Sequence, residues 1–463
     1  MQYPACDLLI DPVLIRKYDT PGPRYTSYPT ADRFVEAFRE TELRQWLDRR
    51  TIGGLSRPLS LYVHVPFCAT LCYYCACNKI PTRDRNASAQ YIKYLDRELA
   101  LLGAEREAYG PLVELHLGGG TPTFLARSEL MALMAAIDRE FARAPDCECS
   151  IEVDPREAPA GTMAFLAYLG FNRASFGVQD FDAQVQRAVN RVQSFELTRS
   201  VIAEARSSGF RSVNLDLIYG LPKQTLDSFN RTLDQVLELD PDRVALYTYA
   251  HLPHLFPPQR RIADHAVPSA ELKLQLLTLA IGRLTRAGYL YIGMDHFARP
   301  DDELALAQAQ GRLHRSFMGY SCHPGDLIGI GVSAIGCIGP AYYQNEKLLD
   351  DYYAKLDAGR LPVARGIERS ADDIVRSAVI QALTCHFRVA IESIELAHLV
   401  DFAAYFAAEL QDMRRLQADG LIELSPDWIV VTPKGRLLVR AICMVFDRHL
   451  RERATRASYS KVI

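Results

Sequence analysis

The chain has 463 residues, a hydrophobic fraction of 49%, a charged fraction of 24% and a formal net charge of −3. These values are ordinary for a soluble protein, and a chain of this length is expected to form two or three domains. The weak negative charge gives no reason to expect a nucleic-acid partner, because phosphate binding needs a basic surface. The sequence has neither a membrane-spanning apolar run nor a secretory signal pattern, so we expect a cytoplasmic protein without a membrane partner.

Short β-rich runs alternate with helical patterns over the first half of the chain. The predicted strands are Leu59–Val65, Leu112–Leu117, Ser150–Val153, Arg173–Val178, Ser212–Ile218 and Val244–Tyr249. Stretches between them, such as 88–107 and 128–144, have apolar residues at helical spacings of three and four. Because parallel strands need helical crossovers, this alternation predicts an α/β fold with an incomplete (β/α)6 TIM-like barrel. A flat, doubly wound parallel sheet is the alternative.

The pattern changes after the sixth predicted strand. A helix is predicted over 270–287 and a strand-like segment over 289–300, whereas the glycine-rich segment 321–340 is typical of a loop with closely packed backbone. From about Ala371 we expect a separate small, mostly helical unit. Its hairpin signal lies in 420–439, where a Ser-Pro-Asp turn separates two alternating runs, as in a winged helix. We therefore predict three consecutive segments, 1–55, 56–365 and 366–463.

The cysteines give the strongest chemical signal. The chain has 11 of them, an odd number, and four fall within ten residues in the spacing C-x3-C-x2-C-x-C: Cys68, Cys72, Cys75 and Cys77. Such a cluster is typical of a metal site and not of a secreted disulfide framework. Three thiolates at this spacing can bind three irons of one iron–sulfur cubane, which leaves the fourth iron for another ligand. The alternative is a structural zinc site, although zinc loops usually take their ligand pairs from two separated segments.

Cys77 leaves one question open. As a fourth ligand it would complete a cubane that only transfers electrons, whereas a cubane with three thiolates keeps an open iron for radical chemistry. The other cysteines are scattered, and a reduced cysteine usually behaves as a small buried hydrophobe.

Glycines and polar residues follow the later strands at positions where barrels place their functional groups. Gly118–Pro122 (GGGTP) follows the second predicted strand, and Glu152, Gln179, Asp216 and Ala250 lie in or after the next four. Each residue alone is unremarkable, because a polar residue at a strand end is commonly just solvated. Together they describe one edge of one sheet, as a small-molecule site requires.

Several segments together resemble the oxygen-independent coproporphyrinogen III oxidase family of radical S-adenosylmethionine (SAM) enzymes. They occur in order from about residue 12: GPRYTSYPT, LYVHVPFCATLCYYCACNK, GGGTPT, IEVDPRE, SFGVQDF, LDLIYGLPKQT, YAHLP and GMDHFARPDDELA. The resemblance implies a [4Fe-4S] cluster held by Cys68, Cys72 and Cys75, and two SAM molecules. Residues lining the cluster-bound SAM would be Tyr62, Gly119, Glu152 and Ile335. Those lining the second SAM would be Tyr74, Gly120, Thr121, Gln179, Arg191, Asp216 and Ala250.

The same resemblance implies a function in haem and porphyrin biosynthesis. The substrate would be coproporphyrinogen III, two of whose propionates are oxidatively decarboxylated to vinyl groups to give protoporphyrinogen IX. A 5′-deoxyadenosyl radical would remove a hydrogen atom from each propionate, with an electron donor and an electron acceptor that the sequence does not identify. A monomer is expected from the resemblance alone.

Two features bear on the substrate. The N-terminal segment would cover the active site, and Arg24 is a candidate partner for a propionate, with an ordinary surface arginine as the equal alternative. Where the family usually has glutamine before Gly-Tyr-Thr-Thr, this chain has Met318 followed by Gly-Tyr-Ser-Cys, and the next loop is slightly shorter. Because methionine lacks the hydrogen bonds of an amide, substrate choice or rate is expected to be the property most affected.

Two other functions compete with this interpretation. A related radical SAM tetrapyrrole protein, either a haem chaperone or a haem-modifying enzyme, would share the barrel, but the chaperones lack both Cys77 and the long N-terminal segment. A non-enzymatic zinc or electron-transfer protein with a winged-helix tail is disfavoured by the many polar groups at strand ends.

Overall fold

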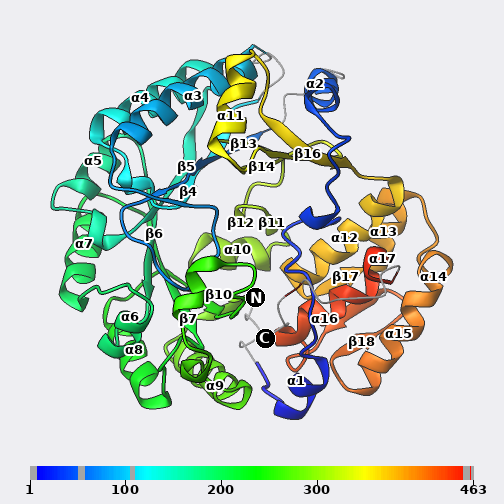
Figure 1. Ribbon diagram of the computed structural model, residues 1–463. Coiled ribbons are helices and arrows are strands. Elements are labelled where there is room, and N and C mark those ends of the chain that lie inside the picture. Colours follow the sequence, from blue (N-terminus) through cyan, green and yellow to red (C-terminus); the bar gives the residue numbers. More distant parts are fainter. Residues whose placement is uncertain (1–7, 51–57, 105–109, 452–458, 460–463) are drawn as a thin grey trace. The chain divides into compact units, whose positions relative to one another are not determined.

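The computed structural model describes residues 8–50, 58–104, 110–451 and 459 (Figure 1). The chain forms two compact units, which are described separately. The barrel unit consists of Arg33–Lys273 and Gly325–Glu368, and the helical unit consists of the described parts of residues 1–32, 274–324 and 369–463. Each unit therefore combines segments that are far apart in the sequence.

The barrel unit is built on a sheet whose strands follow the order β16-β15-β14-β13-β1-β4-β5-β6-β7-β8. The bounds of its strands are β1 Leu59–Val65, β2 Phe67–Cys68, β3 Ile80–Pro81, β4 Leu112–Gly119, β5 Arg143–Val153, β6 Arg173–Gln179, β7 Ser212–Tyr219, β8 Arg243–Thr248, β13 Asp326–Ile330, β14 Ile335–Ile338, β15 Ala341–Asn345 and β16 Val363–Glu368. From β13 through β1 to β8 neighbouring strands are parallel, whereas β13 to β16 pair antiparallel. The six predicted strands are therefore confirmed as one parallel set.

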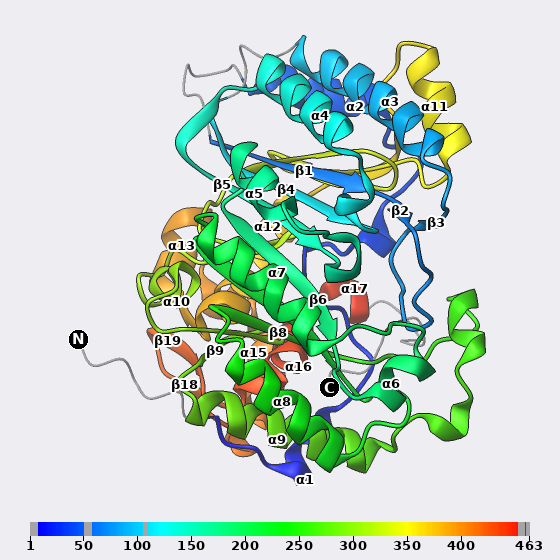
Figure 2. The same ribbon diagram turned by 90° about the vertical axis from the view of Figure 1, so that its left-hand side faces the viewer.

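Helices cover the outer side of these strands, as Figures 1 and 2 show for α3, α4, α5, α7 and α8. The helices of this unit are α2 Glu40–Arg49, α3 Asn86–Gly103, α4 Arg127–Glu140, α5 Thr162–Tyr168, α6 Ala183–Ala188, α7 Phe195–Ser207, α8 Leu226–Glu238 and α11 Leu349–Asp357. The helical patterns at 88–107 and 128–144 correspond to α3 and α4, although residues 105–107 lie outside the described part and residues 143–144 belong to strand β5. Apolar faces of these helices pack on strands whose central residues, such as Leu61, Leu115 and Ile151, are fully buried.

One local prediction was wrong. The glycine-rich segment 321–340 was expected to be a loop, but it forms β13 and β14, and β13 is the parallel neighbour of β1. Close packing of its backbone is confirmed, since a Cβ on Gly329 would lie 2.4 Å from the carbonyl oxygen of Ile335. Glycine normally weakens a strand, but here only glycine leaves room for the neighbouring backbone.

The helical unit contains the C-terminal region. Its helices are α1 Pro12–Tyr18, α9 Ala270–Arg286, α10 Glu303–Ala309, α12 Ala371–His386, α13 Ile391–His398, α14 Phe402–Tyr405, α15 Ala407–Ala418, α16 Val439–Cys443 and α17 Arg448–Arg451. Its strands are β9 Leu290–Gly293, β10 His296–Ala298, β11 His314–Ser316, β12 Gly319–Ser321, β17 Arg388–Ala390, β18 Ile422–Leu424 and β19 Trp428–Val431. The predicted hairpin is confirmed as the antiparallel pair β18–β19, which β17 extends to three strands.

Candidate active site

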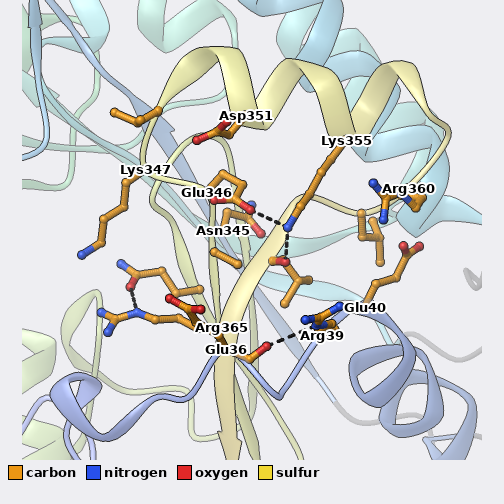
Figure 3. Close-up of a pocket in the computed structure, with 15 residues that line it drawn as sticks. Glu36, Arg39, Glu40, Asn345, Glu346, Lys347, Asp351, Lys355, Arg360 and Arg365 are labelled. Atoms are coloured by element: carbon orange, nitrogen blue, oxygen red, sulfur yellow. Dashed lines mark hydrogen bonds and ion pairs between the residues drawn. The ribbon is translucent and has the colours of Figure 1, made fainter.

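Two cavities of the barrel unit are candidates for an active site. The larger, about 610 Å³, lies between α11, β15, β16 and residues 36–40 (Figure 3). A central cation of this cavity already has partners within the protein. The Lys355 ammonium pairs with Glu346 and donates to the carbonyl of Val363 at 2.6 Å. The described residues that line it include no cysteine. The second cavity, about 350 Å³, contains the predicted cluster ligands and is therefore the candidate site.

The second cavity brings together most of the residues that the sequence pointed to. From that set it is lined by Cys68, Cys72, Tyr74, Cys75, Gly119, Gly120, Thr121, Glu152, Gln179, Arg191 and Asp216. These residues lie on β2, on β4 to β7 and in the connections between these elements, and they share one edge of the sheet as expected for a barrel. The roles given to them remain predictions, whereas their common location is a finding.

The cysteine loop is fixed at both ends by backbone hydrogen bonds. The N–H of Ile80 donates to the carbonyl of Pro66 at 2.7 Å, and the N–H of Thr82 donates to that of Cys68 at 2.9 Å. In the middle, the Asn190 side chain donates to the carbonyl of Leu71 at 2.8 Å. The loop that carries the three cysteines is therefore anchored to the barrel on several sides.

Cys68, Cys72, Cys75 and Cys77 all line this cavity. A cubane takes each of three thiolates on a different iron. A hydrogen bond from Cys77, helped by the nearby charge of Lys79, lowers the pKa of Cys75 below its ordinary value against the effect of burial. This shift favours the thiolate, the form that binds iron.

Glu152 is held at the end of β5 by groups from β4. The N–H of Gly119 donates to its Oε2 at 3.0 Å, and the His116 ring lies 3.6 Å from its Oε1. Burial opposes ionisation, but the interaction with His116 and the hydrogen bond from Gly119 outweigh it and keep the pKa of Glu152 below its ordinary value. The cavity thus contains an ionised carboxylate, which can accept hydrogen bonds from the hydroxyl groups of a ligand.

Asp216 is a second carboxylate of the cavity wall. Ser175 donates to its Oδ2 at 2.9 Å and Asn214 donates to its Oδ1 at 2.9 Å. Burial, together with the charge of Glu152, raises the pKa of Asp216 to about 6 despite these hydrogen bonds. The two carboxylates therefore differ in how readily each takes a proton, although both are ionised at neutral pH.

Arg191, predicted to line the second SAM, is almost fully buried, and its side chain already donates hydrogen bonds within the protein. Its Nη1 donates to Asp154 Oδ2 at 2.9 Å and its Nη2 donates to the carbonyl of Gly177 at 2.5 Å. Only its Nε is buried without a hydrogen-bond partner among the described residues. A polar ligand atom in the cavity would satisfy this nitrogen.

Sequence reasoning missed three charged residues of the wall: Lys79, Asp154 and Arg156. Asp154 and Arg156 lie two and four residues after Glu152 in the segment IEVDPRE. The signal was present in that short motif, but only the fold turns both side chains toward the cysteine loop.

Three predicted residues do not line the cavity: Tyr62, Ala250 and Ile335. The Tyr62 ring stacks on His116 with centroids 5.8 Å apart, so it supports the residue that contacts Glu152. Ala250 follows β8, where its carbonyl accepts from Gln259 at 3.2 Å, and Ile335 begins β14.

Two further residues belong to the helical unit. Arg24 Nη1 lies 3.9 Å from Asp295 Oδ2, and the Arg24 side chain is 37% exposed. The guanidinium is therefore partly exposed and already faces a carboxylate. Met318 lies between β11 and β12 and is partly buried.

Sequence comparisons agree with the motifs. Residues 62–236 match the Radical SAM superfamily, and residues 370–438 match the HemN C-terminal domain. The chain is 51% identical over 98% of both sequences to a protein of Pseudomonas aeruginosa named oxygen-independent coproporphyrinogen III oxidase. A protein of the same name from Escherichia coli is 49% identical, again over 98% of both chains.

Structure comparison gives a match of the same kind. The chain superimposes on a solved structure of coproporphyrinogen III oxidase (HemN) from Escherichia coli, described as a radical SAM enzyme, with a TM-score of 0.91. The match has 46% sequence identity and covers 96% of this chain and 100% of that one. No helix among the described residues is both long and apolar enough to span a bilayer.

Proposed function

Because the chain belongs to the oxygen-independent coproporphyrinogen III oxidase family, we propose that it converts coproporphyrinogen III to protoporphyrinogen IX in haem biosynthesis. The observation that carries this proposal is the 51% identity over 98% of both chains to the relative of that name. The cavity agrees with it, since cysteines with the spacing of radical SAM enzymes border the same space as the carboxylates of Glu152, Asp154 and Asp216.

The cofactors follow from the family, which implies a [4Fe-4S] cluster and SAM. We assign the cluster to Cys68, Cys72 and Cys75, whose donor set is suited to iron. When reduced and bound to SAM, such a cluster supplies a 5′-deoxyadenosyl radical. Each propionate loses one hydrogen atom from its β-carbon, one CO2 and one electron to become a vinyl group, and the electron passes to an acceptor. This chain's own residues position the reactants and exclude water.

We propose two SAM positions in the site. Glu152, with Gly119, Tyr62 and Ile335, would serve the SAM on the cluster, whereas Asp216, with Tyr74, Gly120, Thr121, Gln179, Arg191 and Ala250, would serve the second. The two carboxylates support this division because each is fixed by its own donors. In isothermal titration calorimetry, Glu152→Gln and Asp216→Asn should each weaken a different one of two binding events. A single binding event in the wild-type protein would refute the second position.

The reaction is tested anaerobically. The reconstituted, reduced protein is incubated with SAM and coproporphyrinogen III, and the products are separated by liquid chromatography and identified by mass spectrometry. Protoporphyrinogen IX together with 5′-deoxyadenosine is the expected result, and Cys72→Ala is the negative control. If 5′-deoxyadenosine forms without a vinyl product, the radical chemistry holds but the substrate is wrong.

The second candidate is a related tetrapyrrole protein, a haem chaperone or haem-modifying enzyme. A haem titration followed by absorption spectroscopy separates the two, because a chaperone should bind haem tightly without decarboxylating anything. We further propose that the protein acts in the cytoplasm as a monomer. The predicted cover over the active site, residues 1–55, falls partly on residues 1–7 and 51–55, which lie outside the described residues. Light scattering on the purified chain tests the monomer.

A further inference from the structure

Two guanidinium groups meet at the sulfur of Cys72. Arg156 Nη2 lies 3.6 Å and Arg191 Nη1 lies 3.7 Å from Cys72 Sγ, both within hydrogen-bonding range of sulfur. The two arginine side chains are 17% and 8% exposed, and Cys72 is 8% exposed. These contacts are therefore shielded from water, where hydrogen bonds and charges act most strongly.

Asp154 holds both arginines in place. Arg156 binds its two oxygens with Nε at 3.0 and 3.3 Å and with Nη2 at 2.7 Å, and Arg191 Nη1 binds Oδ2 at 2.9 Å. Although burial opposes it, the charges of Arg191 and Arg156 keep the pKa of Asp154 below its ordinary value. Two positive groups and one negative group therefore stand beside Cys72, with a net positive charge.

We propose that Arg156 is a positioning residue that orients the Cys72 sulfur and raises the reduction potential of the cluster bound there. The proposal rests on the proposed function, because it requires Cys72 to be a cluster ligand. A reduced cluster carries one more negative charge than an oxidised one, so a nearby cation and a hydrogen bond to its sulfur favour the reduced form. Arg156 would thereby make electron uptake, the step that starts the reaction, easier.

The test is a redox titration of the reconstituted full chain without SAM, followed by electron paramagnetic resonance. In Arg156→Ala we expect the ratio of reduced to oxidised cluster at a fixed potential to fall about tenfold, which equals about 59 mV for a one-electron couple. Arg156→Lys keeps the charge but loses the planar fork, so a smaller shift in the same direction is expected. Asp154→Asn removes the negative group and should shift the potential in the opposite direction.

A matched control is Arg127→Ala. Arg127 is likewise held by the protein, since it donates to the backbone carbonyl of Gly161 at 2.9 Å and lies over the ring of Phe165, but it does not line the cavity. Its variant should keep the wild-type potential.

The outcomes separate this inference from the proposed function. Wild-type protein that binds no iron–sulfur cluster would refute the function itself. A normal cluster with an unchanged potential in Arg156→Ala would refute only the role of Arg156. If Arg156→Ala loses its cluster, the lysine variant and Asp154→Asn decide: opposite shifts support the inference, and shifts of the same sign or no shifts overturn it.

Discussion

The hydroxyl of Thr121 lies 3.5 Å from the sulfur of Cys68 and donates a hydrogen bond to it. This contact joins the turn after β4 to the cysteine loop after β1. The N–H of Thr121 also donates to the carbonyl of Phe67 at 2.9 Å, so Thr121 is fixed against the segment that carries Cys68. The glycine turn and the cluster loop therefore form one wall of the site, although each was found in the sequence as a separate motif.

Cys77 is expected to be dispensable for the cluster. Cys68→Ala, Cys72→Ala and Cys75→Ala should each abolish cluster binding, because each removes a thiolate from one iron. Cys77→Ala should keep a cluster that still cleaves SAM. Iron and sulfide analysis with quantification of 5′-deoxyadenosine measures both properties. Loss of the cluster from Cys77→Ala alone would show that the ligand assignment is wrong.

The Asp216 carboxylate should lower the stability of the folded protein while it favours SAM binding. Its pKa is about 6 in the fold and 3.8 ordinarily, so ionising it in the folded protein costs free energy. This cost is absent below about pH 4, grows as the pH rises to about 6 and is constant above that. This difference in pKa corresponds to about 3 kcal/mol, so at pH 7.5 Asp216→Asn should raise the free energy of unfolding by up to that amount.

The same substitution should weaken SAM binding by about tenfold, because the carboxylate is lost as an acceptor for hydroxyl groups. Urea unfolding at pH 4 and pH 7.5 measures the stability, and calorimetry measures the binding. A variant that is equally stabilised at both pH values would contradict the linkage to ionisation.

Gly119→Ala should weaken SAM binding more than an alanine substitution at another glycine that also has a positive φ. Gly119 has a φ of +115°, and a Cβ there would lie 2.5 Å from Cε1 of His64. Gly209 has a φ of +90° but nothing within 4 Å of the added atom. In both alanine variants, backbone strain should lower the free energy of unfolding by about 1 kcal/mol or more, but only Gly119→Ala should also impair SAM binding. Thermal unfolding and calorimetry of the two variants separate these effects, and equal SAM affinities would argue against a tight cradle at Gly119.

Met318→Gln tests the departure from the family pattern. The substitution restores an amide at a partly buried position, with donors and acceptors that methionine lacks. If this position contacts the substrate, the rate of vinyl formation should change severalfold while the rate of 5′-deoxyadenosine formation without substrate stays the same. Both rates come from the same chromatographic assay, and a parallel change in both would indicate a general effect on folding.

Local sequence determined much of the barrel. Segments with the apolar periodicity of strands alternate with segments that have the periodicity of helices, and parallel strands require helical crossovers. The sequence alone therefore predicts the positions of six strands. The cysteine spacing determined the cluster loop in the same way, because the three thiolates lie in one short segment. Glu152, Gln179 and Asp216 were found because functional groups gather at one edge of a parallel sheet.

Tertiary structure decided what depends on partners far away in the sequence. Arg156 and Arg191 reach the sulfur of Cys72 from positions 84 and 119 residues away, and no local period encodes such a contact. Likewise, β13 is a strand only because β1 offers it a parallel partner, whereas its glycines alone favour a loop. Local periodicity reports which face of an element is buried, but the hydrogen-bond partners of a side chain are set only when distant segments pack together.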